Sequence, residues 1–295
     1  MSYQLWISPI TGYRRRGTRT AELRNVYEQG LTTRILYEPL RCCHLDDPAH
    51  EVRDEMARLD FDVVGALEKE QGGAVGYVTR EDLTERGCRE AMRPFAHADL
   101  VSDSTPLIDL LQALSSTERL FVLAGNRVRG IVTRADLQKP PMRVLLFGLI
   151  SMLEMHLTFW VATEYPGEAW KQALSPKRVE AARALLEQRK QHNEEISEFD
   201  CIQFCDKRDL AIDKDVVRER MQLGSKNAAG KVLRAAEELR NGLAHSLGEL
   251  ATSESWPELA SLVKSIEGFL TASDQAVEEM VRKGEAREPI LGVAI

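Results

Sequence analysis

The sequence predicts an α+β protein in which a β-containing N-terminal part precedes an all-α bundle, and three observations lead to this division. The octet GYVTREDL at residues 76–83 returns as GIVTRADL at residues 130–137, with six of its eight positions identical. The stretch QKPPMR at residues 138–143 contains adjacent prolines, which mark a change of structure. After it, apolar residues recur with the helical period and no stretch is rich in strand formers.

Each octet has the same place in a longer repeated pattern. A run of strand formers precedes each octet, and before that run lie a turn with Pro48 or Pro106 and a short amphipathic helix. Each unit therefore predicts the order strand, helix, strand, strand, helix. The sequence therefore predicts an N-terminal extension at residues 1–31, a tandem repeat at residues 32–140 and a helical bundle at residues 141–295.

Composition limits the classes of function. The 295 residues are 43% hydrophobic and 29% charged, which is typical of a globular protein of about two domains. The net charge of −7 argues against bulk, non-specific nucleic-acid binding, but it allows an RNA-cleaving enzyme with a local basic site. Five cysteines without a CxxC pair indicate free thiols in a reducing cytoplasm. Because no secretory signal is recognised, we expect a cytoplasmic protein.

The threonine and aspartate of each octet have the spacing of a helix N-cap and its third residue. In both pairs, Thr79 with Asp82 and Thr133 with Asp136, the hydroxyl can accept a backbone N–H. The aspartate also lies at the positive end of the helix dipole. Helix capping is therefore one sufficient explanation of the octets.

The repeat also resembles a tandem pair of CBS domains, on the Gly-x-x-Thr-x-x-Asp stretch of both octets and its place after two strands. In that family this stretch lines a cleft between the repeats, where threonine and the helix N-terminus face phosphate and aspartate binds the ribose of an adenine nucleotide. The resemblance implies a regulatory ligand of the AMP, ADP or ATP type. The residues expected to contact it are Gly76, Thr79, Arg80, Asp82, Gly130, Thr133, Arg134 and Asp136.

Within this set the glycines are expected to let the backbone approach the ligand, and the two arginines to add charge for phosphate. Asp136 is expected to contribute most, because its repeat conforms best to the family. Ahead of the repeat, PITG at residues 9–12 predicts a hairpin turn and residues 20–30 predict a helix that ends at Gly30. The basic cluster Arg14, Arg15, Arg16 and Arg19 is explained either by solvated or salt-bridged surface or by a phosphate contact to nucleotide or RNA.

Five helices are expected in the C-terminal part, at residues 142–162, 176–193, 197–221, 225–247 and 256–283. The first is long and apolar enough to span a membrane, but Glu154 and His156 lie near its centre. A helix buried in a bundle or dimer explains this apolar segment better than a membrane span does, so we expect no membrane association. Because these two side chains need partners, we expect a homodimer with this helix near the two-fold axis; they are equally explained as support for a nearby site.

The helix at residues 225–247 carries the second motif. Ser225 is its expected N-cap, and the buried stripe is expected at Val232, Ala236, Leu239, Leu243 and Leu247. Counting 100° per residue places Asn241 and His245 opposite that stripe and Arg240 at its flank. These three side chains are therefore expected to face solvent or a partner molecule.

The segment RNGLAH at residues 240–245 resembles the Arg-x-x-x-x-His signature of the HEPN superfamily, whose helical domains include dimeric, metal-independent ribonucleases. The resemblance implies that His245 transfers a proton in attack of the RNA 2′-hydroxyl on the adjacent phosphate. Arg240 would stabilise the charge on the phosphate, and Asn241 would orient His245 or contact RNA. A solvated helix face explains the same six residues without any catalytic role.

The sequence thus predicts a nucleotide-regulated, metal-independent endoribonuclease in stress or defence, with RNA as substrate and no catalytic cofactor. The alternative is a non-catalytic adenine-nucleotide sensor whose helical domain binds a partner protein or RNA. An enzyme that acts on the nucleotide itself is disfavoured, because no Walker motif, metal-ligand cluster or nucleophile elbow is recognised.

Overall fold

The computed structural model divides the chain into two compact units, one of Tyr27–Met142 and one of Met1–Val26 with Arg143–Ile295. It describes residues 20–69, 72–84, 86–190, 197–244, 250 and 255–283. The division differs from the predicted one at the N-terminus, because residues 20–26 cluster with the helical unit rather than forming a separate extension. One contact there is the hydrogen bond from Arg24 Nη2 to Thr271 Oγ1, at 3.1 Å.

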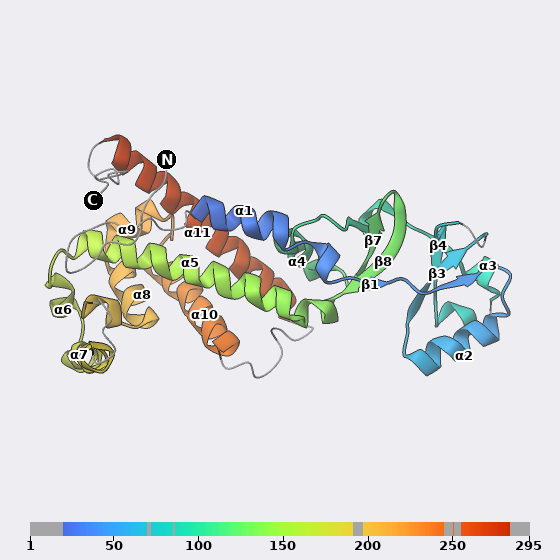
Figure 1. Cartoon of the computed structure of the whole chain (residues 1–295), viewed down its shortest axis with the longest axis horizontal. Coiled ribbons are helices and arrows are strands. Elements are labelled where there is room, and N and C mark those ends of the chain that lie inside the picture. The colour runs from blue at the N-terminus through green and yellow to red at the C-terminus, as the bar shows by residue number, and fades with distance from the viewer. Residues whose placement is uncertain are drawn as a thin grey trace, which may run out of the picture. The chain divides into compact units, whose positions relative to one another are not determined.

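The unit Tyr27–Met142, called here the repeat unit, contains two four-stranded sheets (Figure 1). In one sheet the strand order is β2-β3-β4-β5, and in the other it is β1-β8-β7-β6. Each sheet has an antiparallel hairpin in its centre, a parallel strand on one side and a two-residue antiparallel edge strand on the other. The strands are β1 (Glu38–Pro39), β2 (Cys42–His44), β3 (Val63–Leu67), β4 (Gly76–Thr79), β5 (Arg93–Pro94), β6 (Leu100–Ser102), β7 (Arg119–Ala124) and β8 (Arg127–Thr133).

The predicted order strand, helix, strand, strand, helix is confirmed in both repeats, except that the last element is a short 3-10 helix. The first repeat runs through β2, α2, β3, β4 and η2, and the second through β6, α4, β7, β8 and η4. The helical elements of this unit are η1 (Thr33–Ile35), α2 (Ala49–Leu59), η2 (Asp82–Thr84), α3 (Cys88–Ala91), η3 (His97–Asp99), α4 (Leu107–Ser116) and η4 (Arg134–Gln138).

The cores of the two repeats follow from the apolar spacing of α2 and α4. Val52 and Met56 are the buried residues of α2, one turn apart, and the matching positions of α4 are Leu110 and Leu114. Burial of each such side chain contributes about 1.5–3 kcal/mol. The two sheets contact each other through aromatic rings: the Tyr77 ring lies 4.8 Å from that of Phe121.

The helical unit differs from the prediction at residues 197–221, where one continuous helix was expected. Here η5 (Phe199–Cys201) is followed by α8 (Phe204–Asp213) and α9 (Asp215–Arg220). The first break has a local cause, because the carboxylate of Asp206 accepts the backbone N–H of Gln203 at 2.9 Å and so starts a new helix. The remaining helices are α1 (Thr20–Gly30), as predicted, α5 (Pro140–Glu164), α6 (Ala169–Ala173), α7 (Pro176–Lys190), α10 (Lys226–Ala244) and α11 (Trp256–Arg282).

Helix α5 begins at Pro140, so the two prolines lie in its first turn, where the repeat unit ends at Met142. By length and composition it is the helix in the described ranges that qualifies as a membrane span, and 56% of its apolar window is buried inside the protein. His156 on this helix is fully buried, and its Nδ1 lies 2.6 Å from Ser273 Oγ on α11. The prediction that His156 needs a second subunit to be buried is therefore wrong, because α11 of the same chain supplies the polar partner.

Candidate functional site

A cleft of about 680 Å³ in the repeat unit takes its walls from both repeats. It is built around Thr79 at the end of β4, with α2 and β5 on the side of the first repeat and the start of β7 on the side of the second. Its charged lining residues are four arginines and three carboxylates: Arg53, Arg80, Arg93, Arg119, Asp62, Glu81 and Glu118.

The first octet forms the predicted cap and adds an ion pair that was not predicted. Asp82 N donates to Thr79 Oγ1 at 3.3 Å, and Thr79 Oγ1 donates to Asp82 Oδ2 at 2.8 Å. Arg93 on β5 contacts both carboxylate oxygens, at 2.9 and 2.6 Å. The hydrogen bond from Thr79, followed by the one from Arg93, lowers the pKa of Asp82. The carboxylate is therefore ionised and held in place beside the cleft.

Arg80 lines the cleft and already has a carboxylate partner there. Its Nη2 lies 2.6 Å from Asp62 Oδ1, at the start of β3. The side chain is 35% exposed and that of Asp62 is 78% exposed, so solvent screens the pair and the contact is easily exchanged. A phosphate can thus replace Asp62 on Arg80 at modest cost.

The second octet forms a related cap in a different charge environment, with the backbone N–H of Thr133 as the donor in place of the aspartate N–H. Thr133 N and Oγ1 donate to Asp136 Oδ2, at 2.8 and 3.0 Å. Lys139 Nζ lies 2.8 Å from Asp136 Oδ1 and 2.5 Å from Glu38 Oε1 on β1. The Asp136 side chain is only 11% exposed. Its oxygens accept three contacts, as many as those of Asp82, and its lower exposure, against 19% for Asp82, leaves less room for a ribose than the sequence indicated.

Arg134 does not face the position expected for a phosphate. Its Nε donates to the carbonyls of Leu114 and Thr117 at 2.9 and 3.1 Å, and its Nη2 donates to the carbonyl of Ser115 at 3.2 Å. These carbonyls lie at the C-terminus of α4, which lacks further helical partners for them. The guanidinium therefore caps a helix, and this corrects the expectation that it supplies charge to a ligand.

The two octet glycines are explained by packing within the protein. A Cβ at Gly76 would lie 2.3 Å from the carbonyl oxygen of Arg93, and a Cβ at Gly130 would lie 2.1 Å from the ring of Tyr37. At Gly76 the edge strand β5 occupies the space, and at Gly130 the space is filled by Tyr37, directly before the edge strand β1, and by the carbonyl of Glu38. The expectation that these glycines let the backbone approach a ligand is therefore wrong, because the protein itself fills the space beside them.

Three of the four cleft arginines were not singled out in the sequence. Arg93 had a usable signal, because Arg93–Pro94 pairs with Gly76–Tyr77 as Glu38–Pro39 pairs with Gly130–Ile131. The x-Pro dipeptides are thus part of the repeat. Arg53 and Arg119 had no such signal, since an exposed arginine on a helix or at a strand start has no distinctive local pattern.

In the helical unit, Arg240 lies beside a carboxylate that joins three helices. Arg240 Nε is 3.5 Å from Glu154 Oε2 on α5, and Glu154 Oε1 is 2.9 Å from Nζ of Lys207 on α8. The Arg240 side chain is 41% exposed, and Asn241 is exposed. His245 lies outside the described residues, as does the basic cluster Arg14, Arg15, Arg16 and Arg19.

The buried face of α10 is rotated from the predicted one. The fully buried positions are Ala229, Gly230, Leu233 and Ala236, whereas Val232, Leu239 and Leu243 are only half-buried. Seven residues separate Ala229 from Ala236, and four more lead to Arg240, so Arg240 continues the buried face instead of flanking it. This explains why its guanidinium reaches Glu154. Ser225 is confirmed as N-cap, since its Oγ accepts the N–H of Ala228 at 3.3 Å.

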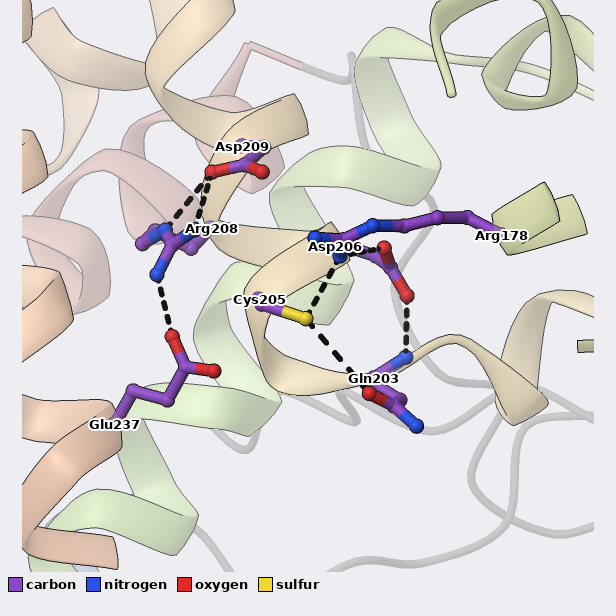
Figure 2. Close-up of polar contacts among 7 residues, drawn as sticks. All are labelled: Arg178, Gln203, Cys205, Asp206, Arg208, Asp209 and Glu237. Atoms are coloured by element: carbon purple, nitrogen blue, oxygen red, sulfur yellow. Dashed lines mark hydrogen bonds and ion pairs between the residues drawn. The ribbon is translucent and has the colours of Figure 1, made fainter. Parts of the chain in front are cut away.

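Helix α8 is held in position by ion pairs on two sides (Figure 2). Arg178 of α7 contacts Asp206 and also donates to Cys205 Sγ at 2.7 Å, while Arg208 contacts Glu237 of α10. Asp206 is buried, so loss of Arg178 would leave an uncompensated charge. These pairs orient α8 and thereby fix Lys207 against Glu154. Among the described residues, no group of three or more His, Cys, Asp or Glu side chains is arranged to hold a metal ion.

Comparison with known proteins identifies one part of the chain. Residues 88–140 match the family model of the CBS domain. Similar solved structures include CBSX2 from Arabidopsis thaliana, at 20% identity over 39% of this chain and 94% of that chain, with a TM-score of 0.32. The CBS domains of a transcriptional regulator from Streptococcus pneumoniae share 22% identity over 36% of this chain and 96% of that chain, also with a TM-score of 0.32.

A third similar structure is that of CBSX2 in complex with AMP, at 18% identity over 39% of this chain and 99% of that chain, with a TM-score of 0.34. No curated protein matches the chain. With the topology described above, the family match shows that the repeat unit has the CBS-pair fold and that a largely helical region follows it.

Proposed function

We propose that the CBS pair binds an adenine nucleotide in the cleft beside Thr79 and that its occupancy regulates the helical unit. The cleft itself is the observation that carries this proposal. Its volume of about 680 Å³ lies in the range typical of small-molecule sites, and four arginines converge on it next to the octet. Because guanidinium groups bind phosphate through several N–H donors, the lining suits a phosphorylated ligand.

Asp82 is the group that would bind the ribose. Its carboxylate has about four lone-pair sites, of which Thr79 and Arg93 use three. The remaining site can accept a ribose hydroxyl, and the lowered pKa keeps the carboxylate in the accepting form at neutral pH. Regulation follows from the cleft's composition, since a ligand that contacts both repeats stabilises one arrangement of them over others.

Calorimetry on the full chain tests this proposal directly. We expect AMP, ADP or ATP to bind, and Asp82→Ala to weaken that binding. Asp109→Ala is the matched control, because Asp109 is an exposed carboxylate on α4 that does not line the cleft. Absence of heat with all three nucleotides, in a sample that unfolds cooperatively, would overturn nucleotide binding.

RNA cleavage by the helical unit is the second function that we propose. The observation that favours it is the position of Arg240, which Glu154 holds beside the exposed Asn241 on the same helix. His245 would act as the proton-transfer group and Arg240 would stabilise the charge on the attacked phosphate. The products would carry a 2′,3′-cyclic phosphate, and DNA would not be cut because it lacks the 2′-hydroxyl. RNA as substrate and a homodimer that brings two motifs together belong to this proposal.

Cleavage of labelled RNA in excess EDTA separates catalysis from the alternative of partner binding without chemistry. His245→Ala should lower the rate by about a hundred- to ten-thousand-fold. Arg240→Ala should also lower it, while Lys231→Ala, an exposed position on the same helix, should leave it unchanged. If RNA is cut equally by all variants, or is only bound and never cut, the catalytic proposal is abandoned in favour of partner binding.

A further inference from the structure

Two helices run across the division between the two units, and both connect to the repeat unit beside the second octet. The division falls after Val26 within α1 and after Met142 within α5. The segment after α1 leads through η1 to β1, which pairs with β8, the strand that ends at Thr133. The second octet itself leads from β8 into α5. Any influence that the chain carries from one unit to the other therefore passes this place.

Lys139, the residue before α5, joins the two connections. Its Nζ lies 2.8 Å from Asp136 Oδ1 in the second octet and 2.5 Å from Glu38 Oε1 on β1. It also donates to the backbone carbonyl of Leu36 at 2.7 Å. Its own backbone carbonyl accepts the N–H of Met142, in the first turn of α5, at 3.1 Å. One residue thus binds both the segment that enters β1 and the segment that enters α5.

We call Lys139 with Leu36, Glu38 and Asp136 the clasp. An ammonium group has three N–H donors, and here each of three oxygens lies within reach of one. The side chain of Lys139 is 33% exposed, so solvent screens these contacts only in part. Although burial alone would lower the pKa of Lys139, its hydrogen bonds to Asp136 and Glu38 raise it. The clasp therefore holds a charged lysine at neutral pH.

The first octet differs in the residues that correspond to the clasp. Three residues after Asp82 the sequence has Glu85, where the second octet has Lys139. The cation that pairs with Asp82 is Arg93 on β5, and β5 leads to η3 and β6 of the second repeat. The lysine is thus present in the octet through which the chain enters the helical unit.

Hydrogen bonds connect the clasp to the cleft. Glu118 lines the cleft, and its carbonyl accepts the N–H of Arg134 at 3.2 Å. Arg134 follows Thr133, whose N–H donates to Asp136 Oδ2 at 2.8 Å. The other oxygen of that carboxylate holds Lys139. A ligand that moves the wall of the cleft therefore acts on the clasp through successive contacts.

From these contacts we propose that the clasp transmits ligand binding from the repeat unit to the helical unit. The inference rests on the proposed nucleotide binding and names the contact through which it regulates. A ligand that fits the cleft better in one arrangement of the second octet increases the population of that arrangement, and with it changes how firmly Lys139 holds the start of α5. Helix α5 is continuous over Pro140–Glu164 and carries Glu154, which pairs with Arg240.

Hydrogen exchange measured by mass spectrometry on the full chain tests the clasp in two steps. Without ligand, Lys139→Met should speed exchange about tenfold or more in residues 31–38 and 142–150, because it removes charged hydrogen bonds at both connections. With saturating AMP, exchange in the wild type should change at the cleft and in α5. In Lys139→Met it should change at the cleft alone.

Lys69→Met is the matched control, since Lys69 is an exposed lysine of the first repeat that does not line the cleft. It should behave as the wild type does in both steps. Glu38→Gln is a second variant, which weakens the clasp but keeps the lysine and so decides the question if Lys139→Met does not fold. Because the Glu38 side chain is 61% exposed, its substitution should give a smaller change of the same kind.

The outcomes separate the clasp from the proposed nucleotide binding. Exchange as in the wild type in both variants without ligand, or an AMP response in α5 that persists in both, would overturn the clasp while nucleotide binding stands. Absence of any effect of AMP on the cleft of the wild type would overturn nucleotide binding instead. An effect at the cleft with none in α5 of the wild type would overturn regulation of the helical unit through the clasp.

Discussion

The two CBS repeats place the same octet in the same backbone frame but surround it with different charges. Arg93 of the first repeat corresponds by strand register to Glu38, and Arg119, which reaches the first site, corresponds to Val63. Arg53 follows Pro48 by five residues, and the same position after Pro106 is Leu111, which is buried. Three of the four arginines that line the cleft at Thr79 thus have no cation at the equivalent position around Thr133.

The shared octet therefore specifies the turn, and residues outside it specify the ligand. In both repeats the aspartate first caps a short helix and then pairs with a cation, Arg93 or Lys139. The arginine after the threonine lines the cleft in the first repeat and caps α4 in the second. The family model matches the second repeat, at residues 88–140, although the first carries the better site for a phosphorylated ligand.

Exchanging the charge between the repeats should have the largest effect. Arg93→Glu introduces the residue type of Glu38 next to Asp82, so two carboxylates would face each other where an ion pair now lies at 2.6 Å. Like-charge contacts of this kind cost several kcal/mol, and nucleotide affinity should fall by about a hundredfold or more. Calorimetry measures the loss. The mirror variant Glu38→Gln should bind normally, and equal losses in both would remove the distinction between the repeats.

The stability of the helical unit should decrease at a higher pH than that of the repeats when the solution is acidified. Burial, with a smaller effect of Arg24, lowers the pKa of His156 from 6.5 to about 4, and Asp274 Oδ1 at 3.8 Å from its Nε2 is the nearby carboxylate. Because the folded pKa is the lower one, the unfolded chain binds more protons between these values, and stability falls as the pH drops from 6.5 towards 4. The difference is worth about 3 kcal/mol.

Urea unfolding followed across this pH range measures the effect, and His156→Gln should flatten the profile. His97→Gln, at an exposed position, should leave the profile as in the wild type. Asp82 has a lowered pKa as well, so its contribution is present above 3.8 and disappears only at lower pH. A profile that is equally steep in His156→Gln would show that another group titrates.

Adding a methyl group to the octet glycines should affect the repeats unequally. Gly76→Ala places Cβ against the backbone carbonyl of Arg93, which cannot rotate away, and should destabilise the unit by about 1–3 kcal/mol. Gly130→Ala meets mainly the side chain of Tyr37. Thermal unfolding should therefore show partial rescue of Gly130→Ala by Tyr37→Ala, and rescue that is complete or absent would contradict this account.

The smallest expected effect compares the two octet aspartates. Asp82→Asn should weaken nucleotide binding by about tenfold, whereas Asp136→Asn should leave affinity unchanged and lower only the stability, since Asp136 is held by Lys139 and the cap. This order reverses the one that the sequence predicted, where Asp136 contributed most. A larger loss of affinity in Asp136→Asn would restore that prediction and place the ligand at the second repeat.

Features that depend on neighbouring residues were predictable from the sequence. The octet caps, the N-cap at Ser225, the helix over residues 20–30 and the order of elements in each repeat all rest on hydrogen bonds or apolar spacing within a few residues. The break in residues 197–221 was missed although its cause is local. There the capping contact from Gln203 to Asp206 competes with a continuous helical pattern, and only the backbone geometry decides between them.

By itself, the sequence determined that the chain holds a repeated CBS-type unit followed by a helical region, because an octet and its flanking strands repeat in register with turns and caps. Tertiary structure alone decided which octet lies in a cationic cleft, since Arg93, Arg119 and Arg53 reach it from three separate elements. It likewise decided that Glu154 contacts Arg240 and that Ser273 satisfies His156. Charge and hydrogen-bond partners act over a few ångströms in space, and residues far apart in a sequence reach that distance only when the chain has folded.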